Sequence, residues 1–387
     1  MPGEQPSGEN ENRIQEEKTV EERAFRRKVV MTSFICCLLV IWNHSGNADL
    51  FLPGTGPETW LYRFEYEWAY ALVRLDIPFF MTISGYLFFR DMSWEKLPGK
   101  WKRRVRSLLV PYLLWNLIWY MAEVCASWVP GLNGLLGKYY LRPDLGGIFR
   151  AAVFFESNPV FWFMFQLILL VILAPVLWFF LKRKWTAVLF AAFLGILWWF
   201  WPPVPVLNTD GLIYYYAGAF WAVHGRSLAE KGWSRRRALA GAGIVLLGAA
   251  IYQVHLRTLL PQPLVLYLMI LPWGIWLLMD ERILTDSFEV AQSRDGLPRS
   301  KIEGRDERRI PEPKRYMKET FFIYATHFYV VRLIGKLAAI PFQGSAAAGA
   351  LLYILMPVPA VFICHMLARI LGRVWPKALE VLNGGRS

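Results

Sequence analysis

Cysteine is scarce in this chain, which has only four in 387 residues. Cys36, Cys37 and Cys364 lie inside apolar runs and Cys125 lies near the end of another, so the spacing indicates no extracellular disulfide framework. The first 28 residues are polar and lack the apolar stretch and small-residue cleavage site of a signal peptide. The first apolar run is therefore expected to remain in the membrane.

Hydrophobic and aromatic residues are abundant. They make up 55% and 16% of the chain, including 19 tryptophans, which exceeds what a soluble core needs. The net charge of +13 could indicate nucleic-acid binding, but the basic residues form short clusters between apolar runs. Membrane orientation explains such clusters better. We therefore expect a polytopic membrane protein without a nucleic-acid partner.

The predicted fold is all-α, with about ten transmembrane helices. A spanning helix needs roughly 20 mostly apolar residues, or fewer when aromatic and basic residues flank it. The predicted spans are 29–46, 65–89, 107–128, 160–181, 185–201, 211–225, 238–256, 263–279, 320–340 and 348–370.

The connecting segments alternate in charge, and the Lys- and Arg-rich segments are expected on the cytoplasmic side. Both termini are then cytoplasmic. Residues 1–28 are predicted to be a polar cytoplasmic segment, 29–372 a transmembrane domain and 373–387 a cytoplasmic tail. Within the domain, the charged stretch 280–319 is predicted to be a flexible cytoplasmic loop.

Ionisable side chains within spans are costly, so each suggests a function. His44 ends the first span, Arg74 and Asp76 lie in the second, and His327 lies in the ninth. Arg74 and Asp76 are two residues apart, so they are not expected to share a helix face or to pair. Carbonyls freed by Pro78 are one candidate partner for Arg74. Structural and functional roles for Arg74 and Asp76 remain open.

The remaining histidines have simpler interpretations. His224 and His255 lie near span ends and are expected to be interfacial, while His365 is expected to form an interhelical hydrogen bond.

Helix rise gives approximate depths for the two histidines of most interest. His44 lies 15 residues after Val29, roughly 22 Å above the cytoplasmic boundary, and His327 lies eight residues after Glu319, roughly 12 Å above it. The two are therefore not predicted at one level. A catalytic pair would require tilt, a broken helix or different boundaries.

Arg103 and Arg106 stand three residues apart in KWKRRVRSLLVPY, so they share a helix face. At the expected cytoplasmic start of the third span, unpaired N–H groups would add to their positive charge and favour a phosphate. The alternative is that these residues only set topology and contact lipid headgroups.

The chain resembles the acyltransferase family 3 membrane proteins, which include bacterial O-acetyltransferases of surface polysaccharides. The resemblance runs from about Lys28 to Gly372 in an ordered series of motifs. These are LLVIWNHSG, IPFFMTISGYLFF, RRVRSLLVPYLLW, PVFWFMFQLILLVILAPVL, IYYYAGAFWAVHG and FFIYATHFYVV.

The resemblance implies transfer of an acyl group, usually acetyl from acetyl-CoA, to a hydroxyl of a glycan or a lipid-linked acceptor in the plasma (inner) membrane. By similarity His44 is the catalytic histidine, and Arg103 and Arg106 bind the donor. No metal cofactor is expected. One departure is Ser33, where many members carry an arginine eleven positions before the histidine. Arg74 is a candidate substitute.

Acyl transfer needs a base for the hydroxyl proton and stabilisation of the oxyanion at the thioester carbonyl. His44 could act as that base or carry the acyl group itself. Further candidates for orienting the base, stabilising the oxyanion or lining the acceptor path are Asn43, Ser84, Trp162, Tyr324 and His327.

Two other classes of protein are alternatives. A proton-coupled transporter or flippase could use Arg74, Asp76 and His327 as a proton relay. A non-catalytic scaffold could use the 280–319 segment for docking.

Overall fold

The computed structural model describes residues 8–200, 206–280 and 315–385, and this part of the chain forms helices and no strand. The chain divides into two compact units. The first consists of residues up to Thr32 together with His224–Lys314, and the second of Ser33–Val223 together with Arg315–Ser387. Most of the predicted loop 280–319 lies outside the described residues.

The first unit is built around a helical hairpin. Its described elements are the N-terminal part of α1 (Gly8–Asn43), α13 (Arg226–Glu230), α14 (Arg235–Thr258) and α15 (Pro261–Leu278). A Cβ atom on Gly241 of α14 would lie 2.7 Å from the carbonyl oxygen of Gly274 of α15. Two glycines therefore allow the backbones of these helices to approach closely.

The second unit contains all the site residues predicted from the sequence. Its helices are the end of α1, α2 (Ala48–Phe51), α3 (Trp60–Ala71), α4 (Asp76–Phe89), α5 (Leu97–Arg104), α6 (Val110–Ser127), α7 (Leu132–Leu136), α8 (Leu145–Phe154), α9 (Trp162–Ile172), α10 (Ala174–Leu181), α11 (Lys184–Phe200), α12 (Thr209–His224, up to Val223), α17 (Arg315–Lys318), α18 (Thr320–Phe342), α19 (Ala346–Leu355), α20 (Pro357–Val374) and α21 (Pro376–Leu382). Short 3₁₀ turns, η1 (Val73–Leu75) and η3 (Pro159–Phe161), precede α4 and α9, and a π-helical turn, η2 (Val105–Leu109), joins α5 to α6.

By length and composition, six helical stretches of the described chain could cross a membrane, or seven if the bent pair Leu145–Phe154 and Pro159–Ile172 is one span. Two shorter apolar helices are Lys184–Phe200 and Ala346–Leu355. The protein is therefore an all-helical membrane protein. The count of ten spans and the orientation of the termini stay predictions.

The predicted tenth span, 348–370, is wrong as a single helix, because α19 ends at Leu355 and α20 begins at Pro357. Pro357 has no N–H group to donate to the carbonyl of Tyr353. The indole of Trp42 donates to the Tyr353 and Ile354 carbonyls instead, at 3.1 Å each. The Trp42 side chain of α1 thus supplies a hydrogen bond to backbone carbonyls at the break between α19 and α20.

The predicted second span, 65–89, lies within one candidate membrane-spanning stretch, Trp60–Phe89, which contains more than one helix. Helix α3 ends at Ala71, and the turn η1 precedes α4, which carries Pro78 in its first turn. Because Pro78 cannot donate to the carbonyl of Arg74, an uninterrupted α-helix through this point would lose a hydrogen bond.

Helices α4 and α12 cross almost backbone to backbone. A Cβ atom on Gly85 would lie 2.0 Å from the carbonyl oxygen of Tyr215, and one on Gly218 would lie 1.9 Å from that of Thr82. The Thr82 hydroxyl also donates to the Tyr214 carbonyl at 3.3 Å. Close packing of the two helices therefore requires glycine at positions 85 and 218.

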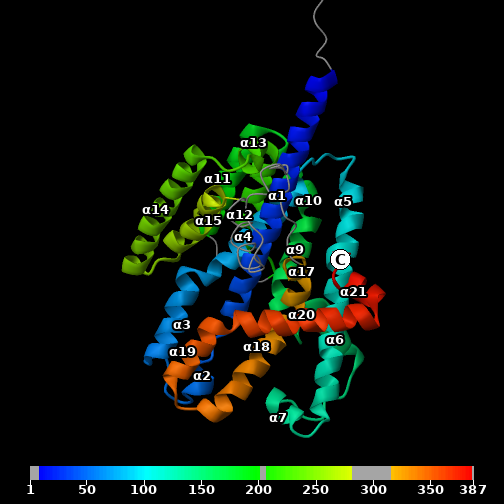
Figure 1. Ribbon diagram of the computed structural model, residues 1–387, viewed down its shortest axis with the longest axis vertical. Helices are drawn as coiled ribbons and strands as arrows, with labels where there is room; N and C mark the ends of the chain where they lie inside the picture. The colour runs from blue at the N-terminus through cyan, green and yellow to red at the C-terminus, as the bar shows by residue number, and fades with distance from the viewer. Residues whose placement is uncertain (1–7, 201–205, 281–314, 386–387) are drawn as a thin grey trace, which may run out of the picture. The chain divides into compact units, whose positions relative to one another are not determined.

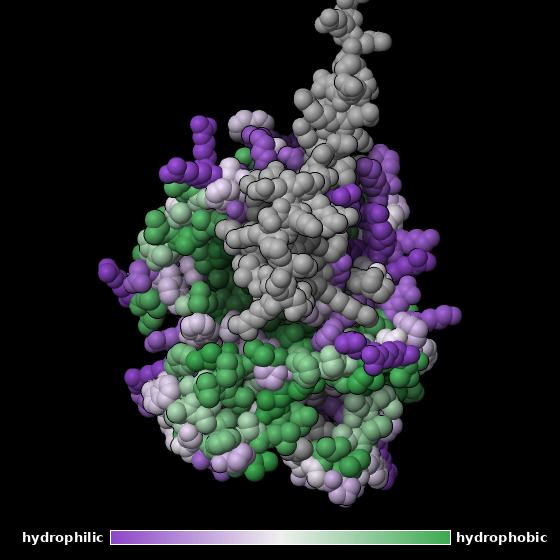
Figure 2. Space-filling model, in the orientation of Figure 1, coloured by the Kyte–Doolittle hydropathy of each residue, from purple (hydrophilic) through white to green (hydrophobic). Residues whose placement is uncertain are grey.

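Exposed apolar side chains follow α20, including Val358, Phe362, Leu367 and Ile370. Figure 2 shows hydrophobic residues gathered over α18 to α20, whereas hydrophilic residues lie over α5. Within the second unit, Figure 1 shows α20 running transversely to α6, so that α21 lies beside α6. An exposed apolar helix surface of this kind suits contact with lipid.

Candidate active site

Helix α1 ends at Asn43, and His44 occupies the following turn, where its backbone N–H donates to the carbonyls of Val40 and Ile41. The buried carboxylate of Glu65 fixes the next residues by accepting from the backbone N–H groups of Asn47 at 3.1 and 3.2 Å and of Ala48 at 3.3 Å. The loop that carries His44 is therefore held against α3.

His327 lies in α18 and is fully buried. Its Nδ1 is 2.7 Å from the Tyr324 carbonyl oxygen and 3.2 Å from that of Ile323. Because carbonyl oxygens only accept, Nδ1 carries the hydrogen, and Nε2 is the acceptor nitrogen in the neutral ring. Among the described residues Nε2 has no hydrogen-bond partner.

The two histidines lie together. Their ring centroids are 5.4 Å apart with an interplanar angle of 45°, and the His44 ring also contacts Phe328 edge to face at 5.5 Å. The prediction that they occupy different levels is therefore wrong.

The predicted depths differed because His327 was counted from Glu319, as if Glu319 lay at the same cytoplasmic boundary as Val29. The Cys37 thiol is 3.7 Å from the carbonyl oxygen of Thr320, so the first residue of α18 lies beside the middle of the apolar run of α1. His44 and His327 each follow this contact by seven residues, which is about 10 Å along either helix.

His44 lines a cavity of about 400 Å³. The polar lining includes Glu65, Asp49, Arg332 and Lys336, and Tyr62 and Phe328 contribute rings. A second cavity of about 330 Å³ shares Phe328, Arg332 and Lys336 with the first. These three residues are spaced by four along α18, so one face of this helix borders both cavities.

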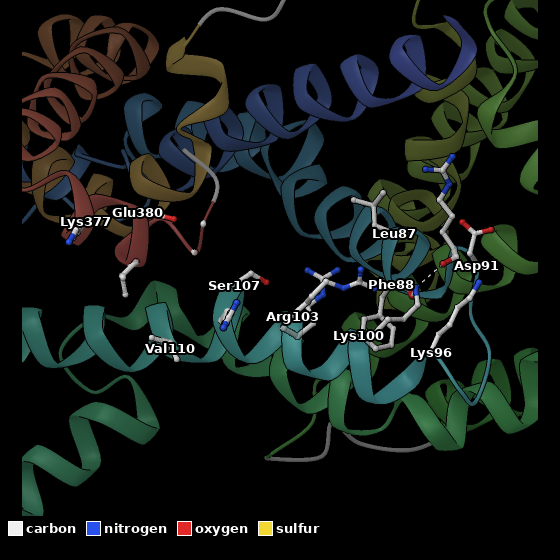
Figure 3. A pocket seen from close by; sticks show the side chains of 16 residues that line it. Leu87, Phe88, Asp91, Lys96, Lys100, Arg103, Ser107, Val110, Lys377 and Glu380 are labelled. Carbon is white, nitrogen blue, oxygen red and sulfur yellow. Dashed lines mark hydrogen bonds between the residues drawn. The ribbon is translucent and has the colours of Figure 1, made fainter. Parts of the chain in front are cut away.

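Arg103 and Arg106 are exposed and line a separate cavity of about 1430 Å³ (Figure 3). Its other basic lining residues are Arg90, Lys96, Lys100, Arg104 and Lys377, against the acidic residues Asp91 and Glu380. The Lys100 ammonium donates to the carbonyls of Phe88 at 2.7 Å and Arg90 at 2.8 Å. The surplus of basic residues suits a ligand with several phosphates.

The expected contribution of helix N-terminal N–H groups at Arg103 and Arg106 is wrong. The helix begins at Leu97, ten residues before the predicted start of the span, and continues through η2 into α6. Lysine, arginine and tryptophan are compatible with helix, so the charged segment extends it beyond the apolar run. The positive charge of the cavity therefore comes from its basic side chains and not from a helix N-terminus.

The π-helical turn beside the arginines has a local cause. Pro111 has no N–H group to donate to the carbonyl of Ser107, so the regular α-helical hydrogen bond is missing at this point. Such π-helical turns commonly occur at functional sites. Gly384 has φ +65°, and a Cβ atom there would lie 2.6 Å from the Ser107 carbonyl oxygen. The Trp115 indole donates to the Leu382 carbonyl at 3.0 Å, so the C-terminal segment is packed against this turn.

Helix α21 therefore forms part of the basic cavity, which the sequence analysis did not predict. Figure 3 shows Lys377 and Glu380 on this helix across the cavity from Arg103. The PKALEVL segment has the composition of a short helix, but only the fold reveals where it packs.

Arg74 and Asp76 interact electrostatically, but among the described residues they form no hydrogen bond or ion pair with each other, as predicted. The guanidinium carbon of Arg74 lies 3.5 Å from the Tyr70 ring centroid, rather than on carbonyls freed at Pro78. Asp76 is buried, and its Oδ1 accepts from the N–H of Ile77 at 2.7 Å. Within the described chain no hydrogen bond or ion pair connects Arg74, Asp76 and His327 into a relay.

Four further candidates do not line the cavity of His44. Asn43 is exposed, and Ser84 and Trp162 are half-buried on α4 and α9. Tyr324 is buried, and its ring lies 6.1 Å from that of His327. Its hydroxyl donates to the Val160 carbonyl, so it holds η3 against α18.

Ser33 lies on α1, half-buried, about 16 Å before His44 along the helix. Glu65, Arg332 and Lys336 are cavity residues that sequence reasoning missed. Arg332 and Lys336 fall inside the predicted span 320–340, so the rule that ionisable residues in spans suggest function could have identified both.

Comparison with known proteins gives one family. The model of the acyltransferase domain of acyltransferase family 3 matches residues 34–284. This region includes His44, Arg103 and Arg106 and ends before α18, which carries His327. No curated protein and no solved structure matches the chain.

Proposed function

Because the chain belongs to acyltransferase family 3, we propose that it is an O-acetyltransferase that moves acetyl from acetyl-CoA to a hydroxyl of a surface glycan or lipid-linked sugar. The observation that carries the proposal is His44, an imidazole at the wall of a cavity beside the fully buried His327. A neutral imidazole in such a place can accept a proton from a hydroxyl as a general base.

In the proposed reaction, neutral His44 accepts the proton of the acceptor hydroxyl while the hydroxyl oxygen attacks the thioester carbonyl carbon. Collapse of the oxyanion breaks the C–S bond, forms the ester and releases the thiolate of CoA, which takes up a proton. His327 does not line the cavity, so its role is to position and support His44 through ring packing. This step needs no metal.

The donor is proposed to bind its phosphates in the basic cavity at Arg103 and Arg106. Helix α6 continues from this cavity, and the Trp119 indole donates to the Ala325 carbonyl at 2.9 Å, two residues before His327. Arg106 and Trp119 are 13 residues apart, which is about 20 Å of helix. A donor with phosphates at one end and a long narrow arm, such as acyl-CoA, suits this separation better than a small acyl phosphate.

The acceptor is proposed to enter the two cavities that share Phe328, Arg332 and Lys336. Tyr62 and Phe328 offer apolar ring surfaces, and the charged side chains offer partners for hydroxyl groups. This combination suits a sugar. The proposed setting is the plasma membrane, with both termini cytoplasmic.

The proposal is tested by incubating purified protein with acetyl-CoA and candidate sugar acceptors and measuring free CoA and the acetylated product. The His44→Ala variant should reduce turnover by about 100-fold or more, because general-base catalysis contributes at least that factor. Its elution profile and thermal stability should match those of the unchanged protein. Retained turnover in a folded His44→Ala variant would exclude the residue from the chemistry.

A further inference from the structure

Two asparagines in the second unit are 0% exposed and contain side-chain atoms without hydrogen-bond partners among the described residues. They are Asn116 of α6 and Asn158, which directly precedes η3, and in both residues Nδ2 and Oδ1 lack a partner. An unsatisfied buried amide typically costs about 1–3 kcal/mol. Such groups are rare in native proteins and require an explanation.

Asn116 lies on the face of α6 that packs toward α18 and the segment 153–161. One turn before it, the Tyr112 hydroxyl donates to the Val153 carbonyl at 2.7 Å, and three residues after it Trp119 bonds to Ala325. The Tyr112 hydroxyl lies within hydrogen-bonding reach of the Asn116 amide, but because its hydrogen is donated to Val153 it can only accept from Nδ2. No donor is therefore left for the Asn116 carbonyl oxygen.

Asn158 lies in a segment that is bonded to α18. The residue before it, Ser157, accepts at its carbonyl from the Tyr329 hydroxyl, and Val160 accepts from the Tyr324 hydroxyl. Both donors belong to α18 and flank His327. His327 itself also has an unsatisfied buried atom, Nε2, among the described residues.

Asn116 also lies between the two proposed ends of the donor. Val110 lines the basic cavity, and Asn116 follows it by six residues, about 9 Å further along α6 toward His327. A chain passing from the cavity to the histidines along this helix meets Asn116 on its way. Because the amides are fully buried, neighbouring side chains must move when such a chain enters.

We propose that Asn116 and Asn158 form a binding site for the secondary amides of the donor arm of acyl-CoA. Each asparagine offers N–H donors and a carbonyl acceptor, which complement the C=O and N–H of a secondary amide. This inference rests on the proposed function and adds two donor-positioning residues to it. Binding of the arm then satisfies groups that are unpaired in the free protein.

The test compares binding of two ligands by the full-length protein. CoA carries the nucleotide and the arm, whereas 3′-phosphoadenosine 5′-diphosphate carries the nucleotide phosphates without the amides. We expect Asn116→Leu and Asn158→Leu each to weaken CoA binding about tenfold, the effect of losing a hydrogen bond of typical strength. Binding of the nucleotide alone should stay within twofold.

Thermal stability separates this role from a structural one. Leucine is close to asparagine in shape, so replacing an unsatisfied amide should leave the melting temperature unchanged or raise it. The matched control is Gln166→Leu, because the Gln166 amide is paired with Val206 at 2.9 Å and Asn208 at 2.8 Å. This control should lower the melting temperature and leave CoA affinity unchanged.

Equal CoA affinity in the unchanged protein and both asparagine variants would overturn the inference, and so would an equal loss for both ligands. Lack of any CoA binding by the unchanged protein would overturn both this inference and the proposed donor. An arm-dependent loss of affinity in a protein that transfers no acetyl would support the amide site and contradict only the proposed reaction.

Discussion

At the scale of single residues, Arg103 and Arg106 provide the most direct test of the donor site. Both line the basic cavity, and charge-assisted hydrogen bonds to phosphate are about twice as strong as neutral ones. The double variant Arg103→Ala/Arg106→Ala should raise the KM for acetyl-CoA at least tenfold, with a smaller effect on kcat. Steady-state kinetics at varied acetyl-CoA concentration would measure this.

Lys102→Ala is the matched control, because Lys102 lies on the same helix and is exposed but does not line the cavity. The KM of the Lys102→Ala variant for acetyl-CoA should remain within twofold of that of the unchanged protein. Equal increases in the control and the double variant would show that only general surface charge matters, and an unchanged KM in the double variant would remove the arginines from the donor site.

Residue spacing predicted some of the site and missed the rest. Helix periodicity predicted that Arg103 and Arg106 share one face, and both line the basic cavity, while their role in donor binding stays a prediction. The proximity of His44 and His327 could not be predicted from residue spacing, because it depends on where α18 begins relative to Cys37. Glu65 was missed because its role depends on the backbone N–H groups of a loop.

At the scale of helices, the crossing of α4 and α12 depends on two glycines. Gly85→Ala or Gly218→Ala would place a methyl group about 2 Å from a backbone carbonyl oxygen, which side-chain rotation cannot relieve. We expect a fall in melting temperature of about 5 °C or more in detergent. Gly195→Ala in α11 is the control, because nothing lies within 4 Å of its added Cβ atom.

The Gly195→Ala variant should have an unchanged or slightly higher melting temperature, since alanine is a better helix former than glycine. A Gly85→Ala variant as stable as the Gly195→Ala variant would show that the two helices do not approach as closely as described.

The sequence predicted where helices occur better than where they break. Apolar runs indicate a helix, but at the interruption at Met356 the carbonyl freed by Pro357, that of Tyr353, is satisfied by Trp42, more than 300 residues away. The packing of α21 against η2 is similarly non-local, because it requires Gly384 at positive φ beside Ser107. Local periodicity carries no information on such contacts.

At the scale of the whole molecule, composition predicted a membrane protein, since 55% hydrophobic residues and 19 tryptophans exceed the needs of a soluble core, and the lengths of the apolar runs predicted helices. The number of spans is harder to predict, because short apolar helices such as α11 and α19 fall below the length of a full span. The relay that the transporter alternative requires is not formed by hydrogen bonds or ion pairs of Arg74, Asp76 and His327 with one another in the described part of the chain.

The most direct test of the central claim is a structure of the full-length protein with a non-hydrolysable acetyl-CoA analogue and a sugar acceptor. The account predicts phosphates against Arg103 and Arg106, and an acceptor hydroxyl about 2.6–3.2 Å from a ring nitrogen of His44 and facing the acyl carbon. An acyl group bound away from His44, or phosphates outside the basic cavity, would contradict it.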